Sequence, residues 1–369
     1  MHVDKRVRGR DMPSASPAKK EVQRGGKRVT IGKFTAPMTR RSTLRTGAGL
    51  AGILATGRAP VFAQAAPKKL LWAHIVPPPE SAAVAFEWMT KEFNERAKGS
   101  LAIEFHGGTL IPKELEIMNA VKTGNIAIGG PAGAAATVFP EMGAFLVPYL
   151  VKDYNSAYAM FNGQIGERLD KEFQEKYKVK VLFFYDYGYR HFWTNKSPIV
   201  EPKDLRGRKI RVQLAKVFSD TIAGLGGNAV PMAWGEVVTA AKQGVIDGGD
   251  LPIVNIDALR IYEVAKFCSM TFHNYGPTLI VMNLEMFQNL SAEHKKPLLD
   301  LGREAQDRVR HATESVDNFE SAKKLLEPKG MTVVEAKVEE FRKVAQEKVW
   351  PIYKSQFGAL WDEIAGFKS

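Results

Sequence analysis

The stretch that decides the fold is LRGRKIRVQ (205–213), followed by GLGGNAVPMAWGEVVTAAKQGVIDGGD (224–250). In its first part, Ile210 and Val212 alternate with polar residues that include Arg211. Alternation with a period of two predicts a strand that has one apolar face and one polar face. Arg211 is therefore expected either on a solvated sheet face or at a binding site.

A regular order of strands and helices precedes this stretch. KLLWAHIV (69–76) predicts a strand, and SAAVAFEWMTKEFNERAKG (81–99) predicts a helix that Ser81 can cap. LAIEFHGG (101–108) and NIAIGG (125–130) predict two further strands, with a helix between them. This order favours an α/β fold with a largely parallel sheet.

The segments that follow the stretch are more helical. One long helix is predicted to begin at Ser291, to continue despite Pro297 and to end near Leu326. MTVVEA (331–336) then predicts a strand, and residues 338–358 predict the closing helix. In sheets of this kind ligands bind beyond the carboxyl ends of the strands. The loops expected to form a site are residues 76–81, 129–135, 186–190 and 248–253.

The charge of the chain is concentrated at its beginning. The 369 residues carry a formal net charge of +12, and their apolar share of 45% is enough for two domains. Residues 1–65 hold 14 of the 52 Lys and Arg but only 3 of the 40 Asp and Glu, which leaves 38 basic against 37 acidic residues. The rest of the chain is therefore almost neutral, and no nucleic-acid partner is expected.

Residues 1–65 have the features of an export leader. The run TRRSTLRTGAGLAGILATGRAPVFAQA (39–65) contains the pair Arg40 and Arg41, a short weakly apolar stretch and a small-residue A-x-A cleavage site. The paired arginines resemble a twin-arginine signal, so the expected partner in secretion is the twin-arginine export machinery and the expected location is the periplasm. A disordered basic tail is the alternative, and residues 1–37 are either a true leader or a misplaced start.

Few residues point to catalysis or to a metal. The one cysteine, Cys268, excludes an internal disulfide and Cys-rich metal sites, and its apolar surroundings predict a buried thiol. No H-x-x-x-H spacing, phosphate-binding loop, dinucleotide fingerprint or G-x-S-x-G is present. The sequence therefore predicts no cofactor, no metal site and no catalytic residue.

The stretch that opened this section carries a family resemblance. LRGRKIR fits the pattern L-x-G-x-K-I-R, and PMAWGEV (231–237) fits P-M-x-(aromatic)-x-E-(aliphatic), with a Gly-rich segment between them and GVIDGGD (244–250) after them. HGGTLIPKELEIMNAVKTGNIAIG (106–129) is similar to a strand, loop and helix of the same family. In this order and spacing the chain resembles the extracytoplasmic solute receptors of TRAP transporters, the DctP-like family, from about Leu70 to its end.

The resemblance implies a two-lobed periplasmic binding protein, or Venus-flytrap, fold. Each lobe would contain a mixed, mostly parallel sheet, and a long helix would span both lobes. One lobe would hold residues 66–187 and 276–315, and the other would hold residues 188–275 and 316–369. The implied function is capture of a small organic acid and its delivery to the TRAP membrane permease subunits, without enzymatic activity.

The resemblance also implies the ligand contacts. In the family, the arginine of the K-I-R element pairs with the carboxylate of the ligand, and it corresponds to Arg211. A planar guanidinium can bind a carboxylate through two parallel hydrogen bonds, which a lysine cannot do. Arg190 corresponds to a second family arginine beside the cleft, and Trp234 corresponds to an aromatic residue that packs against the ligand. A solvated strand face, an ion pair between lobes and a core indole are the respective alternatives.

The sequence departs from the family at one place. Many members read D-G-x-E-N-P where this chain reads DGGDLP (247–252), which puts Asp250 and Leu251 at the Glu and Asn positions. Leu251 cannot form a side-chain hydrogen bond, so the contact of that Asn is lost or supplied elsewhere. Since Phe192, Trp193 and Trp234 are also available, a more apolar acid than sialic acid or a C4-dicarboxylate is expected. Asp250 is also a weak candidate for a bridging cation.

Other functions stay open at this stage. His74, near the first expected loop, is a further candidate ligand contact, as is His191, although lone histidines are more often structural. A periplasmic enzyme on a similar two-lobed frame would use Asp247 or His191 as acid or base. A receptor that serves a sensor or another class of transporter is the third hypothesis.

Overall fold

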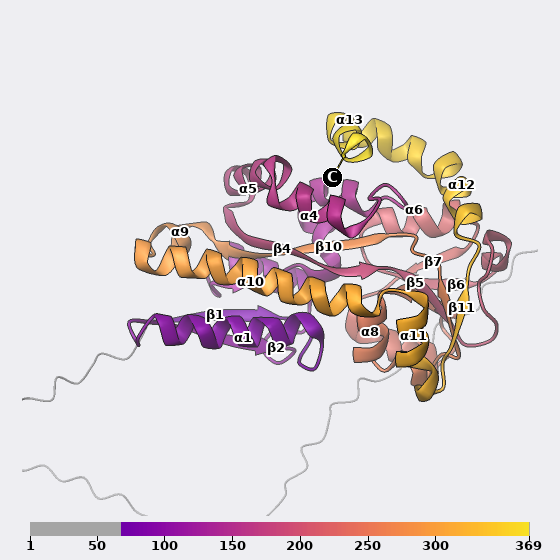
Figure 1. Cartoon of the computed structure of the whole chain (residues 1–369), viewed down its shortest axis with the longest axis horizontal. Helices are drawn as coiled ribbons and strands as arrows, with labels where there is room; N and C mark the ends of the chain where they lie inside the picture. The colour runs from indigo at the N-terminus through magenta and orange to yellow at the C-terminus, as the bar shows by residue number, and fades with distance from the viewer. Residues whose placement is uncertain (1–67, 369) are drawn as a thin grey trace, which may run out of the picture. The chain divides into compact units, whose positions relative to one another are not determined.

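The structure is a computed structural model, and it describes residues 68–368 (Figure 1). The expected leader, residues 1–65 with its twin arginines, lies outside the described residues. Among the described residues, no helix is both long enough and apolar enough to cross a membrane.

The first sheet has five strands in the order β2-β1-β3-β10-β4. β1 pairs in parallel with β2 and β3, whereas β10 runs antiparallel to β3 and β4. Because β1, β2 and β3 are parallel, their carboxyl ends lie at the same edge of the sheet. The bounds of the strands are Lys68–His74 for β1, Leu101–Gly107 for β2, Ile128–Gly129 for β3, Val179–Tyr189 for β4 and Tyr275–Asn283 for β10.

The second sheet has six strands in the order β11-β9-β5-β8-β6-β7. β6 pairs in parallel with β7 and β8, which places Arg211 opposite Val230 and Gly249. β5 runs antiparallel to β8 and β9. The bounds are His191–Thr194 for β5, Lys209–Val212 for β6, Asn228–Pro231 for β7, Gly248–Leu251 for β8, Phe267–Met270 for β9 and Thr332–Glu335 for β11. The predicted fold of two mixed sheets with helices is confirmed.

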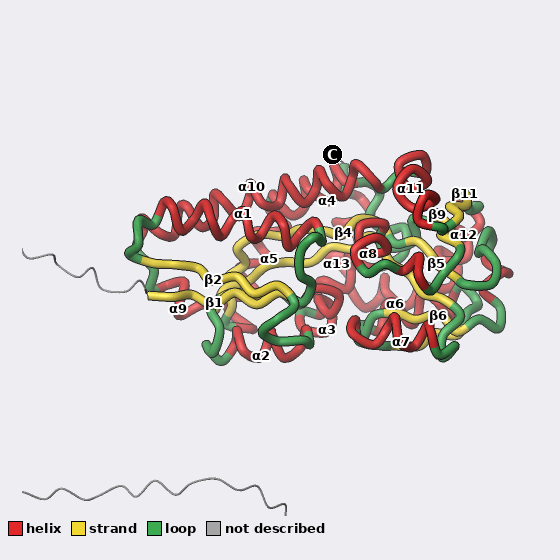
Figure 2. The backbone as a smooth tube through the Cα atoms, turned by 90° about the horizontal axis from the view of Figure 1, so that it is seen from below, coloured by secondary structure: helices red, strands yellow, loops and turns green. Residues whose placement is uncertain are grey.

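Helices cover both faces of the first sheet. α1 (Ser81–Arg96) and α10 (Ala292–Val316) lie side by side on one face, where Trp72, Phe86 and Phe183 are buried (Figure 2). α2 (Glu114–Lys122) and α3 (Ala135–Val138) lie on the other face. Burial of apolar side chains on both faces of a sheet is typical of α/β domains, and it fixes where the strand ends and their loops lie.

The remaining helices complete the chain. They are α4 (Tyr154–Asn162), α5 (Gln164–Tyr177), α6 (Lys216–Gly224), α7 (Val237–Lys242), α8 (Ile253–Ala258), α9 (Leu284–Gln288), α11 (Phe319–Leu326), α12 (Val338–Lys348) and α13 (Trp350–Gly366). Short 3₁₀ segments include η1 (Ala132–Ala134), η2 (Pro140–Leu146) and η4 (Trp234–Glu236). The expected closing helix is thus two helices, and the second, α13, contacts η2 next to the first sheet.

The start of α1 differs from the expected cap. The N-cap residue is Glu80, whose Oε2 accepts a hydrogen bond from the backbone N–H of Ala83 at 2.9 Å. The prediction of Ser81 as the cap is wrong because Ser81 already lies in the first turn. The Glu80 side chain is fully buried, so this cap also places a carboxylate inside the protein.

The long helix ends earlier than expected. α10 stops at Val316, and α11 begins two residues after Asp317, with Asn318 as its N-cap. Asp317 leaves the helical conformation, and its carboxylate accepts hydrogen bonds from the backbone N–H of Tyr189 and from the ring of His191. These hydrogen bonds connect the end of α10 to the junction of β4 and β5. The long helix is confirmed, but its extension to Leu326 is wrong.

Three segments connect the parts of the chain that hold the two sheets. β4 passes into β5 through Arg190, β9 passes into β10 through residues 271–274, and α10 passes into α11 through residues 317–318. The proposed lobe boundaries, 66–187 with 276–315 and 188–275 with 316–369, remain predictions. Cys268 is a buried free thiol, as predicted.

Candidate functional site

The Arg211 site lies where the second sheet meets the junction of β4 and β5. Arg211 is carried by β6, Asp250 by the neighbouring strand β8, and Arg190 by the residue between β4 and β5. All three side chains are almost completely buried, with exposed fractions of 1% to 2%. Buried charges are found in proteins only where they are paired or serve a function, so this group is the strongest candidate for the binding site.

Arg211 is only partly satisfied by its surroundings. Its Nε and Nη2 donate to the carbonyl oxygen of Met232 at 3.2 and 2.8 Å, while its buried Nη1 has no hydrogen-bond partner among the described residues. Burial and the positive charge of Arg190 lower the pKa of Arg211 to about 10, against the favourable effect of Asp250 and Glu114. The solvated strand face that sequence analysis left open is therefore excluded for this residue.

Arg190 is held by Asp250. Its Nε donates to Asp250 Oδ2 at 2.6 Å, its Nη2 donates to the backbone oxygen of Asp250, and its guanidinium lies 5.1 Å from the ring centroid of Phe218. Asp250 Oδ1 is buried and has no partner within residues 68–368. Arg190 is therefore ion-paired with Asp250, whereas Nη1 of Arg211 has no hydrogen-bond partner among the described residues.

His273 completes the environment of Asp250. Its Nε2 lies 3.3 Å from Asp250 Oδ2, and its Nδ1 lies 2.8 Å from the hydroxyl of Thr271. The ring of Phe192 stacks on the imidazole at a centroid distance of 4.3 Å. Burial opposes ionisation of Asp250, but Arg190 and His273 together hold the pKa of this carboxyl well below its usual range. Burial lowers the pKa of His273.

Trp234 and Leu251 have different surroundings. Trp234 begins η4, is half-buried, and packs against two apolar clusters, one in the second sheet and one that includes residues of both sheets. Leu251 is buried in the apolar cluster of the second sheet. Because successive side chains of a strand point to opposite faces, Leu251 points away from the face that carries Asp250.

His74 lies at the carboxyl end of β1, in the first sheet. Its Nε2 is 3.8 Å from Glu80 Oε2, and both side chains are fully buried. Its ring packs against Phe86 and Phe105, with centroid distances of 5.1 and 6.3 Å. Neither ring nitrogen has a hydrogen-bond partner in the described part of the chain, which is unusual for a buried histidine.

Glu114 is a residue of this region that sequence analysis missed. It is the first residue of α2, and only 7% of it is exposed. Burial raises the pKa of Glu114, while the nearby positive charge of Arg211 lowers it. Its position directly after the second expected strand and loop was the signal that could have identified it.

His191, the other candidate histidine, lies at the crossing between the sheets. Its Nε2 is 2.7 Å from Asp317 Oδ1, and its Nδ1 accepts a hydrogen bond from the backbone N–H of Phe272 at 3.3 Å. Since Nδ1 accepts, the proton of the neutral ring is on Nε2 and is donated to Asp317. Both nitrogens are used within the protein. Asp247 likewise accepts from the backbone N–H of Lys209 and lies near Lys196, so neither residue has the geometry of a free acid or base.

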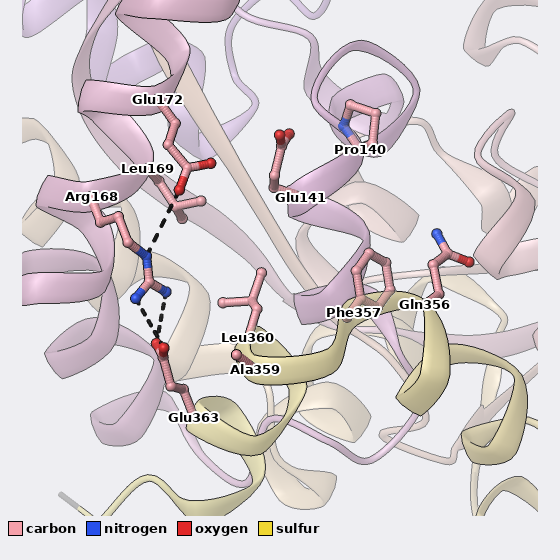
Figure 3. Close-up of a pocket in the computed structure, with 10 residues that line it drawn as sticks. All are labelled: Pro140, Glu141, Arg168, Leu169, Glu172, Gln356, Phe357, Ala359, Leu360 and Glu363. Atoms are coloured by element: carbon pink, nitrogen blue, oxygen red, sulfur yellow. Dashed lines mark hydrogen bonds and ion pairs between the residues drawn. The ribbon is translucent and has the colours of Figure 1, made fainter.

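A separate groove lies away from Arg211. It has a volume of about 520 Å³ and is lined by residues of η2, α5 and α13, where Arg168 donates two hydrogen bonds to Glu363 at 2.9 and 2.7 Å (Figure 3). The side chains that line it, shown in Figure 3, are charged and apolar in a mixture typical of a solvated surface. None of the predicted ligand contacts lines it.

Comparisons with known proteins agree on one family. A family model described as bacterial extracellular solute-binding protein, family 7, matches residues 72–359. The 2,3-diketo-L-gulonate-binding periplasmic protein YiaO of Escherichia coli is 30% identical over 58% of this chain and 67% of its own length. The family match includes the Arg211 stretch.

Two solved structures are similar throughout the described residues. A TRAP periplasmic solute-binding protein of Polaromonas, bound to D-erythronate, is 26% identical with a TM-score of 0.76, over 82% of this chain and 99% of that chain. A TRAP periplasmic solute-binding protein of Citrobacter koseri with bound D-glucuronate is 26% identical with a TM-score of 0.74, over 82% of this chain and 100% of that chain.

Proposed function

The chain belongs to the bacterial extracellular solute-binding proteins of family 7, and we propose that it captures a small organic acid through Arg211. It is a periplasmic solute-binding protein of the TRAP type and not an enzyme, since the family match covers most of the chain and the fold is that of TRAP solute-binding proteins. The proposal concerns the ligand, the residues that hold it and the route of the protein to the periplasm.

The observation that carries the proposal is the free donor of Arg211. Its Nη1 is buried, charged and without a partner among residues 68–368, beside the positive charge of Arg190. An unsatisfied buried charge is costly, and a ligand carboxylate supplies both the missing hydrogen bond and the missing charge. Each charge-assisted hydrogen bond of this kind contributes roughly 1.5 to 3 kcal/mol.

The other predicted residues have distinct roles in the proposal. Arg190 positions Asp250, and the charge of Asp250 keeps Arg211 ionised in its buried setting. Trp234, half-buried between two apolar clusters, offers a ring face to the carbon chain of the ligand. Leu251 acts only through packing of the second sheet, and His74, whose ring nitrogens have no partner among the described residues, is a further ligand contact.

The ligand class that we propose is the sugar acids. The three relatives described above are named for, or contain, 2,3-diketo-L-gulonate, D-erythronate and D-glucuronate. These compounds share one carboxylate and several hydroxyl groups. Asp250 Oδ1, which is buried and has no partner among the described residues, can accept a hydrogen bond from a ligand hydroxyl. This supports sugar acids over the more apolar acid that the sequence suggested.

Uptake follows from closure of the two lobes. Binding of the ligand stabilises the closed state, in which lobes of residues 66–187 with 276–315 and 188–275 with 316–369 meet around the acid. The closed protein then delivers the acid to the membrane permease subunits of the TRAP transporter. The twin arginines at residues 40 and 41 direct export to the periplasm, and replacement of both by lysine is expected to abolish export measured by cell fractionation.

Thermal unfolding of the purified protein against a panel of organic acids tests the proposal. A sugar acid is expected to raise the Tm, and Arg211→Ala is expected to abolish this rise. Arg206→Ala is the matched control, because Arg206 lies in the same stretch but is exposed. The proposal fails if no acid stabilises the protein, or if Arg211→Ala binds as tightly as the parent protein.

A further inference from the structure

Asp317 lies where α10 passes into α11, and its carboxylate accepts three hydrogen bonds from other parts of the chain. Its Oδ2 accepts from the backbone N–H of Tyr189 at 2.9 Å and from the hydroxyl of Tyr154. Its Oδ1 lies 2.7 Å from Nε2 of His191, which carries the proton of the neutral ring. Only 2% of the Asp317 side chain is exposed. A buried carboxylate is stable only when its oxygens accept hydrogen bonds, so these contacts hold the carboxylate and its donors in one arrangement.

The two residues on either side of Arg190 are both bound to this carboxylate. Tyr189 precedes Arg190 and is held through its backbone N–H, whereas His191 follows Arg190 and is held through its ring. The backbone of Arg190 pairs with the segment between β9 and β10. Its N–H donates to the carbonyl oxygen of Asn274 at 2.8 Å, and its carbonyl oxygen accepts from the N–H of His273 at 3.2 Å. The direction in which the Arg190 side chain leaves the backbone is therefore fixed by contacts on both sides.

His191 extends the contact to the segment between β9 and β10. Its Nδ1 accepts from the backbone N–H of Phe272 at 3.3 Å, and the two rings pack edge to face at a centroid distance of 4.5 Å. Phe272 has a φ of 48°, a left-handed conformation that is costly for a residue with a bulky side chain. The hydrogen bond to His191 helps to hold Phe272 in that conformation. The three segments that connect the two sheets thus meet around His191 and Asp317.

Gly188 makes room for the Asp317 carboxylate. The φ of Gly188 is +93°, and a Cβ atom added there would lie 3.1 Å from Asp317 Oδ2. The same atom would lie 2.7 Å from the Tyr154 hydroxyl and 2.7 Å from Cγ2 of Thr313. Because a side chain at this position would meet all three groups, the close approach of Asp317 to β4 depends on a glycine. The conformation of β4 and the carboxylate therefore fit each other.

We propose that Asp317 is a positioning residue of the ligand site and that it acts through Arg190. The inference rests on the proposed function, which takes Arg211 as the carboxylate contact. Arg190 Nε donates to Asp250 Oδ2 at 2.6 Å, and Asp250 lies on β8, the strand that pairs with the β6 strand of Arg211. A displacement at the end of α10 thus reaches the ligand site through a continuous series of hydrogen bonds.

Asp317→Asn tests the positioning of Arg190 without a ligand. Asparagine has the shape of aspartate, but one oxygen is replaced by an NH₂ group that only donates, so the contact to Tyr189 or to His191 is lost. The NMR signal of the Arg190 Nε–H, identified by its absence in Arg190→Lys, is expected to shift or broaden, because its hydrogen bond to Asp250 is disturbed. An unchanged signal in Asp317→Asn would overturn the inference.

Isothermal titration with D-glucuronate and D-erythronate measures the consequence for binding. Asp317→Asn is expected to bind the preferred acid about tenfold more weakly than the parent protein.

Two controls separate positioning from stability. Tyr154→Phe removes a hydrogen bond to the same carboxylate, but not one made by a neighbour of Arg190. Asn318→Ala removes the N-cap of α11, which accepts from the N–H of Ser321 at 3.0 Å. Both controls are expected to lower the Tm and to leave the Arg190 signal and the affinity unchanged.

Two substitutions of His191 test the same inference with Asp317 intact, so it stays testable if Asp317→Asn does not fold. A glutamine amide can replace the Nε2 donor and keep the hydrogen bond to Asp317, whereas an asparagine amide can replace only Nδ1 and keep the contact to Phe272. His191→Gln is expected to bind close to the parent affinity, and His191→Asn is expected to bind about tenfold more weakly. The reverse order would overturn the inference, because the contact to Phe272 would then matter and the contact to Asp317 would not.

The outcomes distinguish this inference from the function on which it rests. If the parent protein binds neither these two acids nor any other organic acid, the proposed function fails, and the expected effect of Asp317 on affinity fails with it. If the parent binds an acid and Asp317→Asn binds it equally well, only the inference is overturned. Equal losses of affinity in Asp317→Asn, Tyr154→Phe and Asn318→Ala would also overturn it, since general destabilisation would then explain them.

Discussion

Asp186 is a buried carboxyl group in β4, close to the crossing between the sheets. It has no exposed surface, its Oδ1 accepts from the backbone N–H of Gly188 at 2.8 Å, and its Oδ2 has no hydrogen-bond partner in good geometry among residues 68–368. Burial raises the pKa of Asp186 to about 6 from an ordinary 3.8, although the nearby hydroxyls of Tyr158 and Tyr275 lower it. The folded state therefore binds this proton more tightly than the unfolded state.

Asp186→Asn is expected to change how stability depends on pH. The raised pKa stabilises the folded protein fully below pH 3.8, and this contribution is lost as the pH rises through about 6. The variant lacks this loss, so its free energy of unfolding relative to the parent should increase by roughly 2 kcal/mol between pH 4 and pH 7.5. Urea unfolding at the two values measures the difference. Asp362→Asn, at an exposed position, is the control, and equal pH profiles for Asp186→Asn and the parent would contradict the pKa argument.

At the scale of the elements, the pairing of β5 with β8 depends on a glycine. Gly249 lies opposite Trp193 in the antiparallel pair, and a Cβ atom at Gly249 would approach the indole ring to 2.6 Å. The indole is almost completely buried and cannot move aside without repacking its cluster. Gly249 is also the partner of Arg211 across β6 and β8, so this packing fixes the strand that carries the site.

Gly249→Ala is expected to destabilise the protein by about 1 to 3 kcal/mol, because an extra methyl group in a packed core forces side chains out of their preferred rotamers. Thermal unfolding without ligand measures this as a lower Tm. Gly366→Ala near the end of α13 is the control, since no atom lies within 4 Å of a Cβ added there. A Gly249→Ala variant as stable as the parent would show that Trp193 is not held against the strand.

The elements that could be predicted from the sequence are those with a strong apolar period. The strand around Arg211, the strand at residues 69–76 and the helix that follows it all form where alternation or helical spacing predicted them. The residues at which the helices begin and end could not be predicted from spacing in the same way. α1 is capped locally by Glu80, which accepts from Ala83, so two neighbouring residues, Glu80 and Ser81, could both serve as the cap in the sequence. α10 stops at Asp317 because its carboxylate contacts the distant residue Tyr189, which local spacing does not encode.

The same distinction holds for the site. Arg211, Arg190 and Asp250 could be named because they lie in a stretch with a recognisable order, and the structure brings them together. Glu114 follows the second expected strand but lies outside the four loops expected to form a site, and His273 has no motif of its own, so neither was predicted. Only the fold places them beside residues that are 97 and 23 positions away in the sequence, Arg211 and Asp250 respectively.

At the scale of the whole molecule, η1 lies against Gln213, the residue after β6, and ligand binding is expected to depend on this contact. Gly133 faces the end of the Gln213 side chain so closely that a side chain at Gly133 would require Gln213 to move aside. Gly133→Leu is therefore expected to hinder closure and to weaken ligand binding about tenfold or more, with little effect on the Tm of the free protein. Isothermal titration with the best sugar acid measures the affinity.

The double variant Gly133→Leu with Gln213→Ala tests whether overlap with the Gln213 side chain is the reason for the weaker binding. Removal of the Gln213 side chain makes room for the leucine, so affinity is expected to recover in part. If Gly133→Leu binds as well as the parent, or if the double variant is no better than Gly133→Leu alone, closure through this contact is not what limits binding.

Arg211 is proposed to bind the carboxylate of a sugar acid, and the other roles in the site depend on this contact. The most direct test is isothermal titration of the purified protein with two compounds: the acid that stabilises it most, and the alcohol in which a CH₂OH group replaces the carboxylate. The account predicts saturable binding of the acid and at least about a hundredfold weaker binding of the alcohol, because the alcohol leaves the Arg211 charge unpaired. Equal affinity for the two compounds would contradict it.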